Sequence, residues 1–282
     1  MTTLACRAIV DERLFARGDL VVCACSGGPD STALLHALGL LRRRLGHDLV
    51  AVGVDHGLRP EARRELEHAA AVAAQLGIPF HVSELAVSPG GNLMARAREA
   101  RHRALQAQAA LHGAACIALG HTADDRAETF LLRLLRGAGP RGLAVMPPRA
   151  TSPFGGVDLV RPIVGARREA VRLHLERHEL ASACDPTNRD GRFLRARVRA
   201  ELLPLLENLS PGATDHLCHL VDMLRLPTLD ASDVLHGFGR AQRREAERAL
   251  RDGRRSITVR VSGGRDVTLT FSEKTPVLPD DP

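Results

Sequence analysis

The sequence lacks tryptophan and tyrosine, and only one of its 39 basic residues, Lys274, is a lysine. Any stacking on unpaired nucleic-acid bases must therefore use phenylalanine, histidine or the planar guanidinium groups of arginine. Enrichment in arginine and alanine is also typical of a biased genome composition. For that reason the charge argument below rests on local arginine clusters and not on the overall skew.

Long apolar runs are missing as well. None approaches the roughly 18 residues that a membrane-spanning helix needs. Met1 to Asp19 mixes charged residues such as Arg13 into a broken apolar pattern, so it lacks the apolar segment of a secretory signal. These absences predict a soluble, cytoplasmic protein with no membrane partner.

Cysteines are few and none are spaced as C-x-x-C; the six are Cys6, Cys23, Cys25, Cys116, Cys184 and Cys218. This spacing argues against a zinc ribbon, an iron–sulfur cluster and a disulfide framework. Cys23 and Cys25 belong to an apolar run, and we expect both in the core. The net charge of +6 suits a polyanionic partner, although charge alone is a weak indication.

Short apolar runs alternate with amphipathic helical stretches from Leu20 onward, a pattern typical of a mostly parallel sheet flanked by helices. The expected strands are residues 20–25, 49–55, 79–85, 114–119 and 157–164. In the helix expected before the fourth strand, one face consists of Leu93, Ala97, Ala100, Ala104, Ala107 and Leu111. The predicted fold class is therefore α/β, with a doubly wound sheet.

The pattern changes after about residue 210. A basic helix is expected from about Phe193, with Pro204 kinking or restarting it. Ser210-Pro211-Gly212 then breaks the periodicity, so we expect a catalytic domain over residues 1–210 and a smaller appendage over residues 211–282. The appendage would hold an arginine-rich helix, a β-hairpin turning at Gly263-Gly264 and a disordered tail rich in proline and aspartate.

The strongest single signal is an S-G-G-P-D-S segment between an apolar strand and a helix, formed by Ser26, Gly27, Gly28, Pro29, Asp30 and Ser31. Adjacent glycines let the backbone turn tightly and present N–H groups to phosphate oxygens, and a helix starting at Ser31 adds its positive dipole end. The carboxylate of Asp30 would repel a bare phosphate, so we expect it to hold Mg²⁺. The lysine of a Walker loop is absent, which disfavours kinases and GTPases. An ordinary glycine-rich turn is the alternative.

Two further polar segments follow expected strands: V-D-H-G-L-R-P-E over residues 54–61 and G-H-T-A-D-D-R-A-E-T over residues 120–129. Because the carboxyl ends of parallel strands lie at one edge of a sheet, both should line one crevice with the phosphate loop. On the helix after His121, Asp124 shares a face with Glu128, and Asp125 with Thr129. The face expected to be buried consists of Ala127, Leu131, Leu134 and Leu135. One carboxylate there could merely cap the helix, but two with a histidine favour a functional site.

Together with D-P-T-N at residues 185–188 and the R-x-x-x-R spacing of Arg195 and Arg199, these motifs resemble the tRNA(Ile)-lysidine synthetase family of PP-loop ATP pyrophosphatases. The resemblance covers about Leu20 to Pro204 and implies an adenine-nucleotide-hydrolase-like catalytic domain. It implies that ATP adenylates O2 of the wobble cytidine of tRNA(Ile) with a CAU anticodon, and that L-lysine then displaces AMP to give lysidine. The sequence departs from the family pattern at Asp55, Met94, His102 and Ala196.

The resemblance also suggests roles for single residues. ATP would be held by the phosphate loop and His56, with Asp30 as the Mg²⁺ ligand. Asp125, or less strongly Asp124, would bind and deprotonate the lysine amine, with His121 beside them. Arg98 or Arg101 would hold the substrate carboxylate or the α-phosphate. The residues expected to contact tRNA are Arg101, Arg195, Arg199, Arg243 and Arg244.

Other interpretations stay open. A tRNA thiolase could use the same loop, but paired cysteines are not evident. A small-molecule ligase of the superfamily would not explain the R-x-x-x-R helix or the basic tail. A non-catalytic RNA-binding relative is disfavoured because Ser26, Asp30, Ser31 and Asp125 are intact. The sequence does not decide the oligomeric state, and a homodimer stays open.

Overall fold

The computed structural model describes residues 9–55, 57, 61–85, 93–182, 194–225, 242, 244–245, 248–249, 252, 254, 256–260 and 266–270. The chain divides into two compact units, Met1–Arg225 and Leu226–Pro282. Among the helices of the described ranges, none combines the length and the apolar character that crossing a bilayer requires. A short 3₁₀ turn, η1 (Glu12–Leu14), precedes the first strand.

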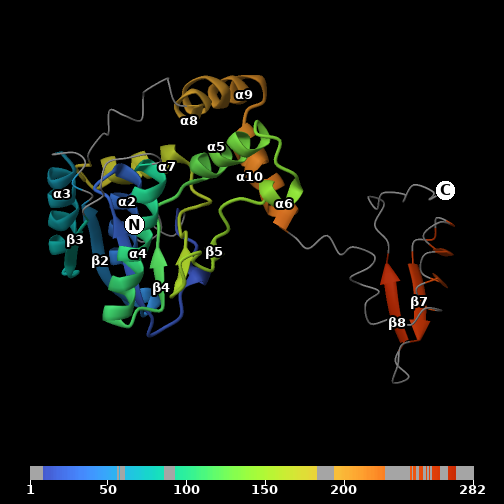
Figure 1. Cartoon of the computed structure of the whole chain (residues 1–282), viewed down its shortest axis with the longest axis horizontal. Helices are drawn as coiled ribbons and strands as arrows, with labels where there is room; N and C mark the ends of the chain where they lie inside the picture. Colours follow the sequence, from blue (N-terminus) through green and yellow to red (C-terminus); the bar gives the residue numbers. More distant parts are fainter. Residues whose placement is uncertain are drawn as a thin grey trace. The chain divides into compact units, whose positions relative to one another are not determined.

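The first unit is built on a six-stranded sheet with the order β3-β2-β1-β4-β6-β5 (Figure 1). Its strands are β1 (Leu20–Cys25), β2 (Asp48–Asp55), β3 (Phe80–Glu84), β4 (Cys116–Ala118), β5 (Arg149–Ala150) and β6 (Asp158–Val160). Neighbouring strands pair in parallel except for β5, which is antiparallel to β6. The winding starts at β1, moves outward to β3 and then continues on the other side of β1. The predicted doubly wound, mostly parallel sheet is confirmed, with the winding reversed between β1 and β4.

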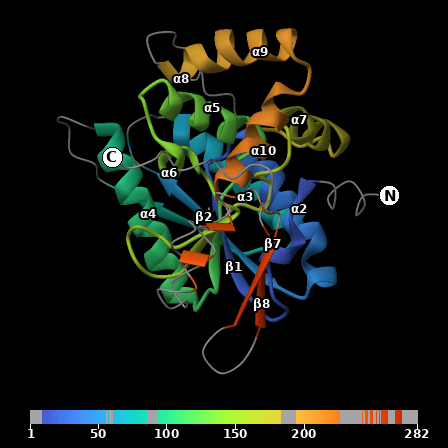
Figure 2. The same cartoon turned by 90° about the vertical axis from the view of Figure 1, so that its right-hand side faces the viewer.

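Helices cover both faces of this sheet (Figures 1 and 2). On one face α2 (Pro29–Leu45), α3 (Glu61–Gln75) and α7 (Arg168–Arg177) share a core with the inward side chains of β1, among them Cys23 and Cys25. On the other face α4 (Leu93–His112) packs against Val22 and Val52. A strand buried on both faces needs an unbroken apolar run, which is why β1 was readable from the sequence.

The buried face of α4 differs from the predicted one except at Ala97, which is buried as expected. Leu105 and Ala109 pack on the sheet, whereas Leu111 is 75% exposed. The helix is rich in alanine all round, so several faces have similar hydrophobicity and the sequence period did not single out the buried one. Only packing against β1, β2 and β4 selects the face.

A third apolar cluster joins five short helical segments. They are α5 (Ala123–Leu134), α6 (Pro140–Leu143), the π-helical turn η3 (Val198–Leu202), α9 (Leu203–Leu209) and α10 (Ala213–Arg225), with α8 (Leu194–Arg197) leading into η3. The π turn ends at Leu202, and α9 begins at Leu203 with Pro204, which has no N–H for helical bonding, in its first turn, so the helix restarts at Pro204 to within one residue of the expected position. Leu134 and Leu135, expected in the core, are 48% and 58% exposed because α5 ends at Leu134.

The division between the two units falls later than the sequence suggested. Arg126, only 3% exposed, forms an ion pair with Asp222 of α10, and the Cys218 thiol donates to the carbonyl of Ala123 over 3.4 Å. These contacts fasten α10 to α5 within the first unit. Ser210-Pro211-Gly212 therefore only turns the chain between α9 and α10, and the boundary lies after Arg225.

The second unit contains a β-hairpin of β7 (Ser256–Arg260) and β8 (Asp266–Thr270), with Ser256 opposite Thr270. This pairing confirms the expected hairpin strands, while Gly263-Gly264 and the expected disordered tail lie outside the described residues. In the region of the expected arginine-rich helix, the residues with helical geometry are Gln242, Arg244, Glu245, Arg248 and Ala249.

Candidate active site

The phosphate loop connects β1 to α2 and is held by its own serines. The Ser31 hydroxyl accepts a hydrogen bond from the Ser26 N–H over 3.1 Å and donates to the Gly28 carbonyl over 3.0 Å. Gly28 is the N-cap of α2, and Pro29 occupies the first turn. The helix therefore begins two residues earlier than the expected Ser31, which places Asp30 on the first turn, beside the positive end of the helix dipole.

Two glycines allow close approach around this loop. Gly27 has φ +77°, and a Cβ there would lie 2.1 Å from the carbonyl oxygen of Glu65 in α3. A Cβ on Gly120, just after β4, would lie 3.0 Å from the backbone of Asp30 and Ser31. The carboxyl ends of β1 and β4 thus meet at the loop, at the point where the winding of the sheet reverses. In sheets of this kind, that crevice is where ligands bind.

Gly27→Ala is expected to displace the loop. A left-handed backbone costs a non-glycine residue about 1–2 kcal/mol, and the contact with the Glu65 carbonyl adds to that cost, so we expect the free energy of unfolding to fall by at least about 2 kcal/mol. Nucleotide affinity should fall by at least about tenfold, because the misplaced N–H groups lose their phosphate contacts. Urea unfolding and calorimetric titration with a non-hydrolysable ATP analogue measure both effects.

Gly28→Ala is the matched control for the folding effect. Gly28 has φ −74°, and its added Cβ would meet only the Ser26 hydroxyl, at an ordinary 3.5 Å. The free energy of unfolding of Gly28→Ala should stay within about 0.5 kcal/mol of the value for the parent chain. Equal stability of the two variants would contradict the role assigned to the backbone of Gly27.

Asp30 carries a buried carboxylate whose Oδ1 has no hydrogen-bond partner among the described residues. Burial, with the nearby charge of Asp125, raises the pKa of Asp30 to about 6, while Arg168 and Arg199 act in the opposite direction. A buried oxygen without a donor, beside a phosphate-binding loop, has the chemistry of a Mg²⁺ ligand. The residues present therefore fit the expected metal role of Asp30.

The raised pKa of Asp30 predicts how stability depends on pH. The folded state disfavours the ionised form of Asp30, and this lowers the free energy of unfolding. The loss of stability is absent below pH 3.8, the ordinary pKa of the group, grows as the pH rises to about 6 and is constant at higher pH. Asp30→Asn should therefore be more stable than the parent at pH 7.5, by up to about 3 kcal/mol, and equally stable near pH 4. Urea unfolding at both pH values checks this, and an unstable variant at pH 7.5 would contradict it.

A cluster of opposite charges lies at the start of α5. Glu128 is fully buried, and its carboxylate receives Arg168 at 3.2 Å, Arg195 at 3.0 Å and Arg199 at 2.6 Å. The same three arginines reach Asp125 Oδ1 at 3.3, 3.4 and 3.5 Å. Sequence reasoning placed Glu128 on the face of Asp124 but gave it no role, whereas the structure makes it the centre of the cluster. Its position four residues after Asp124 was the available signal.

The Asp125 carboxylate is held in place by hydrogen bonds and nearby positive charges. It forms a capping box with Thr122, whose N–H and hydroxyl donate to Oδ2 over 3.0 and 3.1 Å. Burial alone raises the pKa of Asp125, but the Thr122 N–H and the charges of Arg168, His121 and Arg195 lower it below its usual range. The Asp125 side chain therefore both caps α5 and belongs to the candidate site. Asp124 differs, since it accepts the Arg168 backbone N–H over 2.6 Å.

A second, cationic group surrounds His121. Burial, together with the charges of Arg161, Arg101 and Arg98, lowers the pKa of His121 to about 4, and Asp125 opposes the shift. Burial and Arg98 also lower the pKa of Arg101, and burial and Arg98 lower that of Arg161 to about 10. Within the described ranges neither Arg98 nor Arg101 has a carboxylate in ion-pair contact. The arginines around His121 therefore form a site that is suited to binding an anion.

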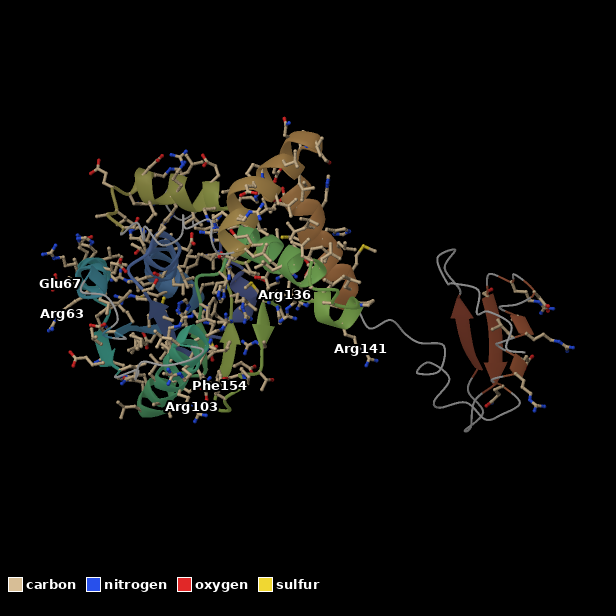
Figure 3. All side chains as sticks on the ribbon, turned by 45° about the horizontal axis from the view of Figure 1, so that its top comes forward. Arg63, Glu67, Arg103, Arg136, Arg141 and Phe154 are labelled. Atoms are coloured by element: carbon tan, nitrogen blue, oxygen red, sulfur yellow. The ribbon has the colours of Figure 1, made fainter. Side chains whose placement is uncertain are left out.

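The remaining predicted residues are only partly placed. Arg195 and Arg199, expected on RNA, contact Glu128 and Asp125 in this state. Arg244 is exposed in the second unit, while His56 and Arg243 lie outside the described residues. An aromatic platform was not anticipated: Phe154, 38% exposed, stacks on His102 at 5.6 Å and has the Arg103 guanidinium 5.8 Å from its ring centre (Figure 3).

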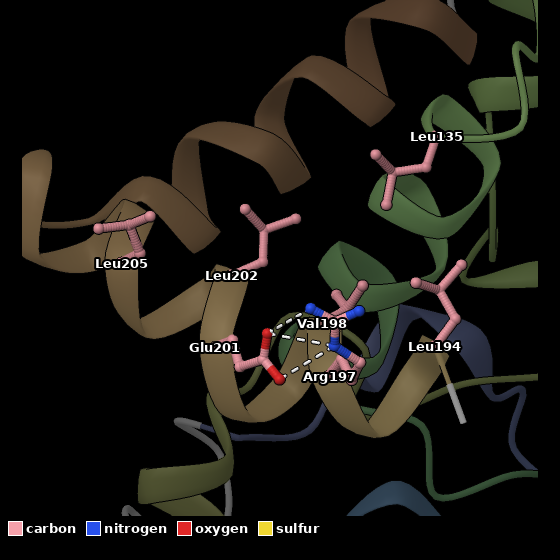
Figure 4. Close-up of a pocket in the computed structure, with 7 residues that line it drawn as sticks. All are labelled: Leu135, Leu194, Arg197, Val198, Glu201, Leu202 and Leu205. Atoms are coloured by element: carbon pink, nitrogen blue, oxygen red, sulfur yellow. Dashed lines mark hydrogen bonds and ion pairs between the residues drawn. The ribbon is translucent and has the colours of Figure 1, made fainter. Parts of the chain in front are cut away.

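A groove between the end of α5 and the α8–α9 segment has a different character (Figure 4). Its lining is Leu135, Leu194, Arg197, Val198, Glu201, Leu202 and Leu205. Arg197 and Glu201 pair with each other over 2.9 Å, so their charges are already matched. This mostly apolar lining does not suit nucleotide phosphates, and Arg195 and Arg199 leave the same segment toward Glu128 instead.

The loop at the reversal point and the acidic helix start facing it define a PP-loop protein. The family described as PP-loop domain matches residues 6–206. A solved structure, the U34-tRNA thiolase from Methanococcus maripaludis with its iron–sulfur cluster, shares the fold with a TM-score of 0.66 and 17% identity, over 79% of this chain and 77% of that chain.

Relatives with similar sequences identify a family within the PP-loop class. The tRNA(Ile)-lysidine synthase of Salinispora arenicola (strain CNS-205) is 45% identical over 215 residues, which is 74% of this chain and 63% of that protein. The tRNA(Ile)-lysidine synthase of Salinispora tropica is 44% identical over 225 residues, 77% of this chain and 67% of that protein. This chain belongs to the tRNA(Ile)-lysidine synthase family. It spans about two thirds of the length of these curated relatives.

Proposed function

We propose that this chain uses ATP to join L-lysine to C2 of the wobble cytidine in tRNA(Ile) with a CAU anticodon. Cytidine O2 attacks the α-phosphorus of ATP and pyrophosphate leaves; the lysine ε-amine then attacks C2, a proton is lost and AMP leaves with O2. Family membership supports the reaction, and one structural observation carries the site: the phosphate loop and Asp30 face the Asp125–Glu128 cluster. A reaction that uses ATP, L-lysine and tRNA supports a cytoplasmic location.

The loop side of the site would bind the nucleotide. Backbone N–H groups at the start of α2 would bind the leaving pyrophosphate, and the Ser26 hydroxyl would donate a hydrogen bond to it, while the Ser31 hydroxyl holds the loop through Gly28. Asp30, with its partnerless Oδ1, would hold Mg²⁺, which when bound neutralises the charge on the phosphates. His56 is assigned to the nucleotide from the family resemblance alone.

The acidic cluster would bind the lysine ammonium. Asp125 keeps its charge at neutral pH because its pKa is lowered, so it suits binding of a cation better than acceptance of a proton. Arg168, Arg195 and Arg199 already contact Asp125 and Glu128, and an incoming ammonium would compete with them. Their positive charge would also lower the pKa of the bound amine toward its neutral, nucleophilic form, and His121, whose charge interacts with Asp125, and Asp124 are assigned to accept its proton.

The cationic group would hold the anionic parts of the substrates. Arg98 and Arg101, which lie near His121, suit the α-phosphate or the lysine carboxylate. Phosphates of tRNA are assigned to Arg101, Arg195, Arg199, Arg243 and Arg244, and such contacts position the RNA without reading its sequence. With Tyr and Trp absent, the exposed Phe154 beside Arg103 is the described ring best suited to stacking on a base.

A thiolase-like modification is the alternative within the PP-loop class. Sulfur transfer to an activated base calls for reactive cysteines, but Cys23, Cys25 and Cys116 are buried in the sheet. Burial raises the pKa of the Cys116 thiol to about 11, which makes it a poor nucleophile. The described cysteines therefore favour lysine over sulfur as the second substrate.

The testing experiment combines the purified chain with Mg²⁺, ATP, L-lysine and a tRNA(Ile) transcript that carries a CAU anticodon. Pyrophosphate release and the mass of the wobble nucleoside are followed together. A mass gain equal to lysine minus water, dependent on ATP, is the expected result. Pyrophosphate release without lysine incorporation would keep the PP-loop chemistry and reject lysine as the nucleophile.

A further inference from the structure

Three histidines meet where α2 packs against α7, on the face of the sheet shared by these helices. His36 comes from α2, His174 from α7, and His178 is the residue that caps the C-terminal end of α7. One ring nitrogen from each of the three lies within 4.8 Å of the others, and His36 Nδ1 is 3.0 Å from His174 Nε2. The ring centres are 4.6 to 5.1 Å apart.

Hydrogen bonding does not satisfy this cluster. Across the described part of the chain, the three rings share one hydrogen bond, which joins His36 to His174. His174 Nδ1 and His178 Nε2 are both buried and have no hydrogen-bond partner among the described residues. His36 and His174 are only 8% and 4% exposed, so water does not readily replace the missing partners. Buried polar atoms without partners are rare and call for an explanation.

We propose that His36, His174 and His178 bind one divalent transition-metal ion of the zinc class. His174 and the cap residue His178 are four residues apart, a spacing also found in zinc sites, and their rings lie on the same side of the end of α7, with centres 4.7 Å apart. Zinc–nitrogen bonds of about 2.0–2.1 Å in a tetrahedral site put ligand nitrogens about 3.3 Å apart, close to the observed 3.0 Å. Imidazole ligands without carboxylates favour zinc, copper or nickel over magnesium and calcium.

The ion would connect two helices that both begin at the candidate active site. α2 begins with the phosphate loop and Asp30, and α7 begins with Arg168, which contacts Asp124, Asp125 and Glu128. Holding His36 to His174 and His178 fixes the distance between the loop and Arg168. The role is structural, and it does not depend on which base or amine the enzyme uses.

The test uses the full, untagged chain after chelation and dialysis. Co²⁺ is added and its visible d–d absorption is followed, since tetrahedral cobalt reports imidazole ligation directly. We expect one equivalent to bind, zinc to displace it, and zinc at about a hundred times its dissociation constant to raise Tm by roughly 5–10 °C. His178→Gln should weaken cobalt binding by at least about tenfold, because even loss of a group beyond the ligands typically has that effect.

His219→Gln is the matched control, since His219 is an exposed histidine on α10. It should bind cobalt like the parent. Absence of tetrahedral absorption in the parent chain, or equal cobalt affinity in the parent and His178→Gln, would overturn the proposal. If His178→Gln does not fold, the stoichiometry and the zinc-dependent Tm of the parent still decide the matter.

Discussion

Asp30→Asn is expected to lower the rate of ATP-dependent pyrophosphate release by about 10³-fold. The substitution keeps the shape of the side chain but removes the charge that would hold Mg²⁺ against the phosphates, and charge stabilisation of this kind contributes several kcal/mol to a transition state. The buried Oδ1, which has no hydrogen-bond partner within the described ranges, lies on the first turn of α2 and places that charge beside the loop. Single-turnover pyrophosphate release at saturating ATP measures the effect.

The control for this loss is Asp48→Asn, at the exposed start of β2 and at the opposite end of the strands from the loop. It should release pyrophosphate at the parental rate. Because Asp30→Asn is also expected to gain stability at pH 7.5, a lost rate cannot be attributed to unfolding. If Asp30→Asn releases pyrophosphate at a rate within about tenfold of the parent rate, Asp30 is not a ligand of the proposed metal site.

Glu128→Gln is expected to lower the free energy of unfolding by about 3 kcal/mol. Loss of one partner from a buried ion pair costs about 3–5 kcal/mol, since the opposite charges stay behind uncompensated. Here three arginines lose their partner, but they are 32%, 43% and 31% exposed and can turn partly toward water, so we take the lower value. Urea unfolding measures the change, and Tm should fall by roughly 6–12 °C.

Glu201→Gln provides the matched comparison. Glu201 also pairs with an arginine, Arg197 at 2.9 Å, but both side chains are more than half exposed, so the removal of its charge should leave the free energy of unfolding close to that of the parent. The double variant Glu128→Gln with Arg199→Gln should recover part of the loss, because the two residues are coupled. If Glu128→Gln proves as stable as Glu201→Gln, Glu128 is not the centre of the cluster.

The parts of the fold that the sequence predicted are those with local physical causes. Strands buried on both faces require unbroken apolar runs, so the bounds of β1, β2 and β4 were predicted to within one or two residues. The two-residue strand β5 has no such run and was missed. The buried face of α4 was predicted wrongly because an alanine-rich helix has no distinct apolar stripe.

The candidate site shows the same division. The phosphate loop could be predicted because strand, glycine-rich turn and helix follow each other directly along the chain. Glu128 could not be assigned, because its partners Arg168, Arg195 and Arg199 are 40, 67 and 71 residues away. For the same reason Arg195 and Arg199 were expected only on RNA, since no local pattern shows that they contact buried carboxylates.

By itself, then, the sequence determined the α/β class, the family and the phosphate loop, because each depends on residues adjacent in the chain. The tertiary structure alone decided the charge cluster around Glu128, the boundary after Arg225 and the meeting of His36 with His174, 138 residues apart. Contacts between distant segments depend on how the helices pack on the sheet, and that packing is a property of the whole chain.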